Sequence, residues 1–485
     1  MTIREVWKVN WPAILVLIAY LLVGTLYAIY TPLWQAPDEP AHYNYVRSLA
    51  AGGGFPVMQP GDYDQAYLSR LTTEGFPPEL SIEPLAYEGH QPPLYYVLAV
   101  PCYWLFQGSV RALRLFSLMI GGVGVVVIFA ILREVRPTEP GIAWFGGGLV
   151  ALIPQYLSIM ASVNNDAMVL ALFWLWLWLA LRYLRGQASP WVLGGVAGAV
   201  LLTKATGYHV LPLMLLIVYL RYRRTGMSWG WMARQLVALL LPALLLGGVW
   251  WIRNVTVYGW PDVMGLQRHD LVVQGQLRTS ELIAELGMAG FLRSASWTTF
   301  RSFWGQFGWM GVVLDLRIYQ GLLIFSTLSF AGALWRLVDL VQRGTDVRQR
   351  DALILLGSAA LITVTMYVGY NVVYVQHQGR YLFSALPFVG LAIALGWQQL
   401  LHRELAVGMS FVLLLAIVVV GVWGLLSDGP PLWPMAMMGG AAVGLPVLAY
   451  ASMRWRAVAI AGALVGMVAL DLWCLFGFIV PMLAS

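Results

Sequence analysis

Charged side chains are scarce in this sequence. Asp, Glu, Lys and Arg make up 11% of its 485 residues, against about 25% in an average soluble domain. A water-soluble protein of this length is therefore excluded. Hydrophobic residues make up 60% of the chain, enough for many segments of about 20 apolar residues, the length that crosses a bilayer. The composition predicts an all-α protein with many membrane spans.

Cysteine is almost absent, and nucleotide-binding motifs are absent. Cys102 and Cys474 lie far apart in apolar surroundings, which excludes a disulfide framework and a CxxC metal or redox motif. The chain has no GxGxxG or Walker pattern and no fixed-period repeat, which argues against nucleotide hydrolysis and against the inverted repeats of transporters. The net charge of +6 comes from Lys and Arg scattered between apolar runs, so it indicates membrane anchors and no nucleic-acid surface.

The apolar runs predict about 13 transmembrane helices. The first follows Arg4 and Lys8 and is too long for a signal peptide. A further segment, 91–107, contains three prolines and is either a span or a helix lying at the interface. The thirteen predicted spans are 11–33, 111–132, 142–160, 167–184, 188–206, 207–221, 233–252, 318–341, 352–371, 381–401, 407–426, 434–452 and 457–480.

The distribution of Lys and Arg settles the predicted orientation. If 91–107 does not cross, the basic clusters between spans all fall on one side, which is the cytoplasmic side by the positive-inside rule. We therefore expect a cytoplasmic N-terminus, an outer C-terminus, and two long outer connections, 34–110 and 253–317, that carry interfacial helices. The expected parts are a catalytic module over 1–252, a Trp-rich outer loop over 253–317 and a C-terminal module over 318–485.

The strongest motif follows the first span: Asp38 and Glu39 lie between prolines in the sequence WQAPDEPAH. One interpretation is an interfacial turn in which Asp38 caps the next helix. The other is a general base, placed where a lipid-borne substrate and a water-side substrate meet. Capping needs only one acid, so the pair favours catalysis, with His42 nearby for binding.

Two more polar motifs are predicted on the outer side. The segment EGHQPPLYY contains His90, Gln91, Tyr95 and Tyr96, and its tyrosines either anchor a helix at the interface or stack on a sugar ring. Asn165 and Asp166 stand in a short turn, which is ordinary turn chemistry unless Asp166 shares a cavity with Asp38.

Three cations, Lys204, Arg253 and Arg380, lie at the outer ends of predicted spans. Each alone is explained by snorkelling to the lipid headgroups. Together with the acids, they would suit a phosphate group, which Arg can bind through two N–H groups. His377 and Gln378 add hydrogen-bonding groups beside Arg380. Asp471, in the middle of the last span, has no functional interpretation beyond packing.

In the order in which they occur, DEPAH, HQPPLYY, NND, KATG and QGRY resemble motifs of the GT-C superfamily of membrane glycosyltransferases, over about residues 11–401. The resemblance implies transfer of a sugar from a polyprenyl-phosphate carrier in a bacterial inner membrane. It implies Asp38 as the base with Glu39 beside it, Asp166 as the acid of the second outer loop, and Arg380 as the phosphate ligand. The aminoarabinose transferase branch has Lys where this chain has Gln91, so phosphate binding falls to Lys204, Arg253 or Arg380.

We therefore expect an inverting sugar transfer to a hydroxyl of a glycan, lipid or protein at the outer face. No cofactor is required by these motifs, although the carboxylates and histidines leave a divalent metal open. A transporter or flippase for a phosphate-bearing lipid is the alternative, and a non-catalytic assembly partner is a third interpretation. The polar groups gather at one face rather than at mid-membrane, which favours the enzyme.

Overall fold

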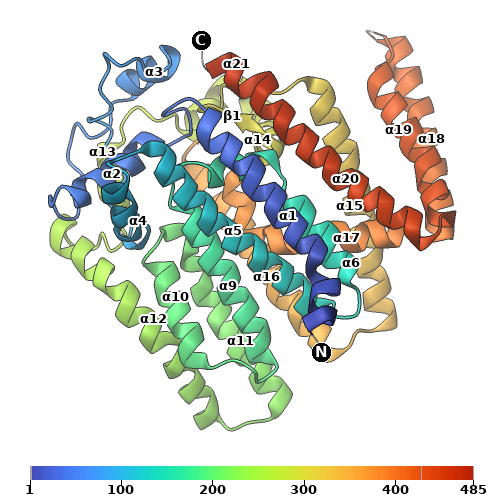
Figure 1. Cartoon of the computed structure of the whole chain (residues 1–485), viewed down its shortest axis with the longest axis horizontal. Coiled ribbons are helices and arrows are strands. Elements are labelled where there is room, and N and C mark those ends of the chain that lie inside the picture. Colours follow the sequence, from blue (N-terminus) through green and yellow to red (C-terminus); the bar gives the residue numbers. More distant parts are fainter. Residues whose placement is uncertain (1–2, 428, 484–485) are drawn as a thin grey trace.

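The computed structural model describes residues 3–427 and 429–483 and shows a helical bundle with one short antiparallel ribbon (Figure 1). The predicted all-α class is confirmed. Up to residue 258, the chain forms α1 (Ile3–Tyr30), α2 (Glu39–Ala50), α3 (Gln65–Thr73), α4 (Leu94–Leu105), α5 (Val110–Val135), α6 (Pro140–Ile142), η1 (Ala143–Gly147), α7 (Gly148–Ala151), α8 (Pro154–Met160), α9 (Asp166–Leu184), α10 (Pro190–Leu201), η2 (Ala205–His209), α11 (Val210–Thr225) and α12 (Trp229–Tyr258).

The rest of the chain begins with a short helix and a kinked one, followed by the ribbon and the remaining long helices. These elements are α13 (Leu266–Val272), α14 (Thr279–Trp304), β1 (Gln306–Phe307), β2 (Val312–Val313), α15 (Leu316–Arg343), α16 (Val347–Val373), η3 (Gly379–Ala385), α17 (Leu386–Leu400), α18 (Arg403–Leu426), α19 (Leu432–Tyr450), α20 (Met453–Trp473), η4 (Cys474–Ile479) and α21 (Val480–Leu483).

Within residues 3–427 and 429–483, ten helices are long and apolar enough to cross a membrane, and a pair bent by 64° over Pro140–Met160 makes at most eleven. The predicted number of thirteen is therefore not confirmed. The two other predicted spans, 188–206 and 207–221, correspond to α10 with 12 residues and α11 with 16, both shorter than the roughly 20 residues of a span. The helical path stops between them because Lys204 has an extended backbone and pairs with Asp166.

The two long connections lie at one end of the bundle, which we call the loop end (residues 34–110 and 253–317). Figure 1 shows α2, α3 and α13 toward the upper left of the view and β1 near the middle of its top. Leu94–Leu105 is a short apolar helix that packs on α2 and α5. Its predicted interfacial position stays a prediction, as does the orientation of the chain across the membrane.

The basic connections meet at the opposite end. Arg185, after α9, pairs with Glu134 at the end of the 26-residue α5, and Arg224, at the end of α11, pairs with Asp351 at 3.4 Å. The side chains of Arg4 and Lys8 lie outside the described residues. Glu134 and Asp351 thus pair with basic residues at this end of the bundle.

One close helix crossing joins the early and late parts of the chain. Gly146 in η1 meets Gly390 in α17, and a Cβ on Gly146 would lie only 2.2 Å from the carbonyl oxygen of Gly390. Helix α17 directly follows η3, which carries Arg380. This crossing therefore helps to place Arg380 against the elements that carry Asp38. The predicted division into three parts stays a prediction.

Candidate active site

The turn after α1 presents Asp38 to the interior of the loop end. Asp38 precedes α2 with φ 66° and ψ −3°, in the left-handed region, and within the described chain its side chain makes no capping hydrogen bond. Its Oδ1 instead accepts a hydrogen bond from the Tyr87 hydroxyl at 3.0 Å, and its Oδ2 accepts one from Nη2 of Arg380 at 2.6 Å. The DEPAH and QGRY motifs, 342 residues apart, therefore face each other.

Glu39 points away from Asp38 into the protein. It is fully buried, and both its carboxylate oxygens accept hydrogen bonds from Arg114 of α5, at 2.7 and 2.6 Å. The backbone N–H groups of Trp34 and Val163 also donate to it, each at 3.1 Å. Arg114 further donates to carbonyl oxygens at the end of α1 and just beyond it, including Thr31 at 2.6 Å. Glu39 thus fixes the turn that presents Asp38.

A second ion pair lies beside the first. Asp166 is the first residue of α9, and its Oδ1 accepts a hydrogen bond from Nζ of Lys204 at 2.7 Å. Behind the pair, the Tyr96 hydroxyl bonds to Nδ1 of His42 at 2.8 Å and accepts from the Asn165 amide at 3.2 Å. This buried polar chain ties α2, α4 and the start of α9 together.

The two ion pairs border a cavity of about 710 Å³, within the usual range of about 300–1,000 Å³ for ligand pockets. Its polar wall includes Asp38, Glu88, His90, Gln91, Lys204, Gln378 and Arg380. Nε and Nη1 of Arg380 are buried, and among the described residues they have no hydrogen-bond partner. The cavity continues along α16, past Thr363, Met366, Tyr367 and Tyr370. The cavity therefore has a charged part, lined by Asp38, Lys204 and Arg380, and a more apolar part along α16.

The two carboxyls that line the cavity, those of Asp38 and Glu88, differ in acidity. Burial alone would raise the pKa of Asp38, but the charge of Arg380, its hydrogen bond and the positive charges of His42 and Lys204 together lower that pKa to about 2. Burial, and next the negative charge of Asp38, raise the pKa of Glu88 to about 7. Burial also lowers the pKa of the His42 imidazole to about 3. At neutral pH, Asp38 is therefore ionised and His42 is neutral, while Glu88 is near its titration midpoint.

Other predicted site residues point elsewhere. Arg253 donates to the backbone oxygens of Gly89 at 3.3 Å and Pro56 at 2.5 Å, and it stacks over Trp250. The Tyr95 hydroxyl is buried against Ser117 Oγ at 2.7 Å. His377 is buried beside Phe291, with ring centroids 5.4 Å apart. Their predicted roles in binding stay predictions.

Sequence reasoning missed four residues that contact this site or support it: Tyr87, Glu88, Arg114 and His269. Glu88 begins the EGHQPP segment and Tyr87 immediately precedes it, so the neighbouring motif was a signal for both residues. Arg114 lies within the predicted span 111–132, and a charge inside a span indicates a buried partner. His269, whose ring centroid is 4.8 Å from that of His90, carries no signal in the sequence around it.

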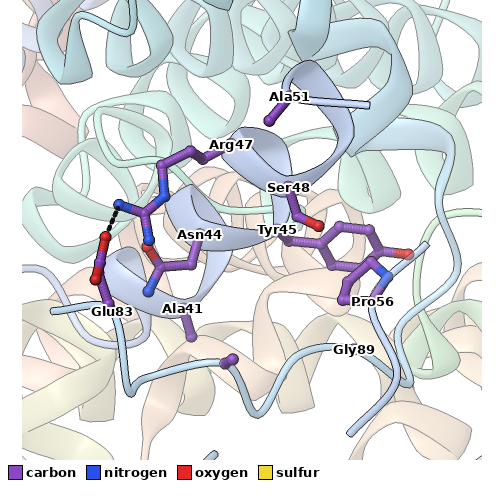
Figure 2. Close-up of a pocket in the computed structure, with 10 residues that line it drawn as sticks. Ala41, Asn44, Tyr45, Arg47, Ser48, Ala51, Pro56, Glu83 and Gly89 are labelled. Atoms are coloured by element: carbon purple, nitrogen blue, oxygen red, sulfur yellow. Dashed lines mark hydrogen bonds and ion pairs between the residues drawn. The ribbon is translucent and has the colours of Figure 1, made fainter. Parts of the chain in front are cut away.

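A second, smaller pocket lies on another face of α2. It measures about 410 Å³ and is lined by Ala41, Asn44, Tyr45 and Ser48 of that helix together with Glu83 and Gly89. Figure 2 shows Arg47 reaching Glu83 across its rim, at 3.0 Å. Helix α2 thus lines this pocket, whereas Asp38, the residue just before the helix, lines the larger cavity.

Metal ligands do not cluster at the site. Across residues 3–427 and 429–483, no group of three or more His, Cys, Asp or Glu side chains is placed to hold a metal ion. His90 and His269 are close, but no third side chain of this kind within the described chain completes a site with them. The metal that the sequence left open is therefore not part of the mechanism proposed below.

Comparison with solved structures finds similar folds at low identity. ArnT from Cupriavidus metallidurans bound to undecaprenyl phosphate shares 17% identity over 97% of this chain and 74% of that chain, with a TM-score of 0.49. The apo state of the same protein gives 18% identity, coverage of 100% and 74%, and a TM-score of 0.47. The oligosaccharyltransferase of Archaeoglobus fulgidus, in complex with Zn and sulfate, shares 15% identity over 88% of this chain and 53% of that chain, with a TM-score of 0.43.

A family model matches part of the chain. Residues 90–251 match the family described as dolichyl-phosphate-mannose-protein mannosyltransferase. This segment includes Asp166 and Lys204, while Asp38 and Arg380 lie outside it. No curated protein matches the sequence. The predicted resemblance to the GT-C superfamily is confirmed by the family match over this segment.

Proposed function

We propose that this chain, which resembles the GT-C superfamily, is a membrane glycosyltransferase. It moves a sugar from a polyprenyl-phosphate carrier to an acceptor hydroxyl at the outer face of a bacterial inner membrane. One observation carries the proposal: Arg380 donates to Asp38 through one nitrogen and has two buried nitrogens without a partner among the described residues, and Lys204 lines the same cavity. A carboxylate base and a phosphate-binding cation are thus placed together.

The cations suit the phosphate of the donor. Two N–H groups of one guanidinium can bind two phosphate oxygens, which an ammonium group cannot do. In Arg380, Nε and Nη1 are the nitrogens without a partner in the described chain; they lie on different edges of the guanidinium, so each can donate a hydrogen bond to a phosphate oxygen, and Lys204 lies on the same cavity wall. The extension of the cavity along α16, past Met366 and Tyr367, gives a path for the prenyl chain.

The reaction is a displacement at the anomeric carbon. The acceptor oxygen forms the new C–O bond from the face opposite the phosphate, so the configuration inverts, and the bond to the phosphate oxygen breaks. Asp38 takes the acceptor proton. The leaving phosphate gains negative charge, draws the Arg380 guanidinium toward itself and weakens its hold on Asp38. The carboxylate therefore becomes more basic as the proton arrives. Base catalysis of this kind contributes about 10²–10⁴-fold.

The remaining polar groups orient the reactants. The Asp166–Lys204 pair and the chain from His42 through Tyr96 to Asn165 hold α2, α4 and α9 at fixed distances. His90, Gln91 and Gln378 line the cavity, where they can hydrogen-bond a sugar. Glu39 acts through Arg114 as a positioning residue, because it is fully buried away from the cavity.

Replacing Asp38 by Asn tests the function. We expect Asp38→Asn to insert and fold as the wild type does, but to release polyprenyl phosphate at least about 10²-fold more slowly, because the amide cannot accept the proton. The purified protein in detergent is given undecaprenyl-phosphate-linked pentoses and hexoses together with glycan, lipid and protein acceptors from the cell envelope, and the freed carrier is quantified. The matched control is Asp64→Asn at the exposed start of α3, where Asn preserves the helix cap.

The same assay separates the enzyme from the alternative transporter. A transferase releases the carrier without any membrane barrier, whereas a flippase makes no product in detergent. Absence of release by the wild type with every donor would remove the glycosyltransferase proposal. Near wild-type release by the Asp38→Asn variant would remove Asp38 as the base and leave the reaction class standing.

A further inference from the structure

Glu88 is a cavity carboxyl that the mechanism above does not use. Its side chain is buried, lines the larger cavity, and has one carboxylate oxygen, Oε2, without a partner among the described residues. A buried carboxylate is usually paired, because moving a charged group out of water without giving it a partner costs much free energy. Packing alone therefore gives no reason for an acid at this position.

The backbone around Glu88 is held firmly from behind. The Gly89 carbonyl accepts hydrogen bonds from Arg253 at 3.3 Å and from Tyr258 at 3.4 Å. The Glu88 carbonyl accepts one from the backbone N–H of Gln91 at 2.9 Å. Immediately before it, Tyr87 holds Asp38. The segment thus fixes two carboxyls in one cavity, one paired and one without a partner.

The surroundings of Glu88 are crowded with charge. Its pKa is raised to about 7 by burial first and then by the charge of Asp38, against the opposing effect of Lys204. The groups that face it come from α2, α4, α9, α16, the turn before η2, and η3, with two histidines on the cavity wall. They are Asp38, Tyr45, Tyr87, Tyr96, Asp166, Lys204, Tyr370 and Arg380, and the histidines are His90 and His269.

Asp38 alone is a poor final holder of a proton. In the resting site its pair with Arg380 keeps its pKa at about 2, so the proton taken from the acceptor is lost to any stronger base nearby once Arg380 pairs with Asp38 again. An effective acid–base group has a pKa near the working pH, and Glu88 meets this condition. The two carboxyls line the same cavity, so a water molecule in that cavity can carry the proton from one to the other.

We propose that Glu88 is a second acid–base residue of this cavity, which receives the proton that Asp38 takes from the acceptor hydroxyl and releases it to water. The proposal rests on the proposed glycosyltransferase function. In each turnover the acceptor O–H bond breaks, and the proton moves to Asp38 and then to Glu88. The carrier phosphate leaves with the electron pair of the C–O bond. Both carboxylates are restored when Glu88 loses its proton to water.

The test is the pH profile of carrier release by the full-length protein in detergent. For the wild type, we expect kcat to fall as the pH drops through about 7, because a protonated Glu88 cannot accept another proton. Glu88→Gln should lower kcat at pH 8 by about 10-fold or more, lose this acidic limb and keep the donor KM. Glu88→Asp should restore part of kcat. The matched control is Glu83→Gln, an exposed acid five residues upstream that pairs with Arg47.

A second readout separates a chemical role from a structural one. Because Glu88 Oε2 has no partner in the described chain, Glu88→Gln should keep or raise the thermal midpoint. A variant that retains the wild-type pH profile and kcat overturns the role of Glu88 while leaving the glycosyltransferase in place. A Glu88→Gln variant that is slow, strongly destabilised and still has the acidic limb also overturns it. A wild type that releases no carrier overturns the proposed function, and this inference falls with it.

Discussion

At the scale of single residues, the proposed site depends on one guanidinium that pairs with Asp38 and would also bind the donor phosphate. Arg380 donates to Asp38 through Nη2, while Nε and Nη1 have no partner in the described chain. A planar fork can hold a carboxylate on one edge and a phosphate on another, whereas an ammonium group offers a single point of charge. The identity of this side chain therefore matters beyond its charge.

Arg380→Lys should keep the fold and the charge but lose the second edge. We expect kcat/KM for the polyprenyl-phosphate sugar to fall by about 10- to 100-fold, as when one or two charge-assisted hydrogen bonds are removed. In Arg380→Ala this kcat/KM should fall further, because Asp38 also loses its partner. Arg278→Lys, a change at a half-exposed Asp270 pair of the loop end, is the control. Wild-type kinetics in Arg380→Lys would dismiss the fork as a phosphate ligand.

The acidity of Glu88 also has a consequence for stability. Its pKa is raised in the folded protein from 4.5 to about 7, so the folded state binds the proton more tightly than the unfolded state does. The ionised form therefore opposes folding, and stability falls as the pH rises from about 4.5 through about 7. Above pH 7, Glu88→Gln should raise the thermal midpoint, and at pH 4 the two proteins should unfold together. Tryptophan fluorescence during heating in detergent checks both.

At the scale of elements, the Glu39–Arg114 pair fixes the start of α2. The pair is fully enclosed and satisfies backbone groups of α1, the following turn and the chain before α9. Removing one partner of such a pair leaves an unpaired buried charge, which costs about 3–5 kcal/mol, whereas removing both costs far less. The adjacent acids of the motif are thus divided between anchoring and chemistry.

Arg114→Met should therefore lower the thermal midpoint strongly and reduce carrier release, since the turn that carries Asp38 loses its anchor. The double variant Glu39→Met with Arg114→Met should recover much of the stability. Arg111→Met, an exposed position on the same helix, is the control. If Arg114→Met were as stable as the wild type, the anchoring role of the pair would be refuted.

Elements could be predicted wherever hydropathy decides them. The long apolar runs that become α1, α5, α9 and α12 stand out in the sequence because crossing a membrane requires about 20 apolar residues. Hydropathy does not show where a tertiary contact stops a helix. Lys204, which pairs with Asp166, separates α10 from η2. The predicted spans 188–206 and 207–221 therefore correspond to short helices.

The candidate site shows the same limit. Motif order placed Asp38, Asp166, Lys204 and Arg380 at one end, and the structure brings their side chains into adjacent pairs. Motifs do not show which way a side chain turns from its helix. Arg253 therefore proves to bind backbone at Gly89 rather than to face the cavity. Glu88, in a motif already singled out, was missed because only burial and the charge of Asp38 make it distinctive.

At the scale of the whole molecule, the site exists only because distant parts of the chain are held together. Asp38 belongs to the first loop-end connection and Arg380 to η3, so the Asp38–Arg380 distance of 2.6 Å depends on how α17 seats against the early helices. Helix α17 contacts the early helices where Gly390 crosses Gly146. A Cβ on Gly390 would lie only 2.8 Å from the carbonyl oxygen of Gly146. Nothing larger than a hydrogen fits between these backbones without moving them.

Gly146→Val should therefore push α17 away and shift Arg380 relative to Asp38. We expect a lower thermal midpoint and a loss of carrier release, although Gly146 lies outside the cavity wall of the described chain. Gly141→Ala, five residues earlier, is the matched control, because a Cβ at Gly141 meets no described atom within 4 Å. A Gly146→Val protein with wild-type release would show that the Asp38–Arg380 pair forms independently of this crossing. A release defect in Gly146→Val alone would show that the spacing of two transmembrane segments sets the distance between base and phosphate ligand.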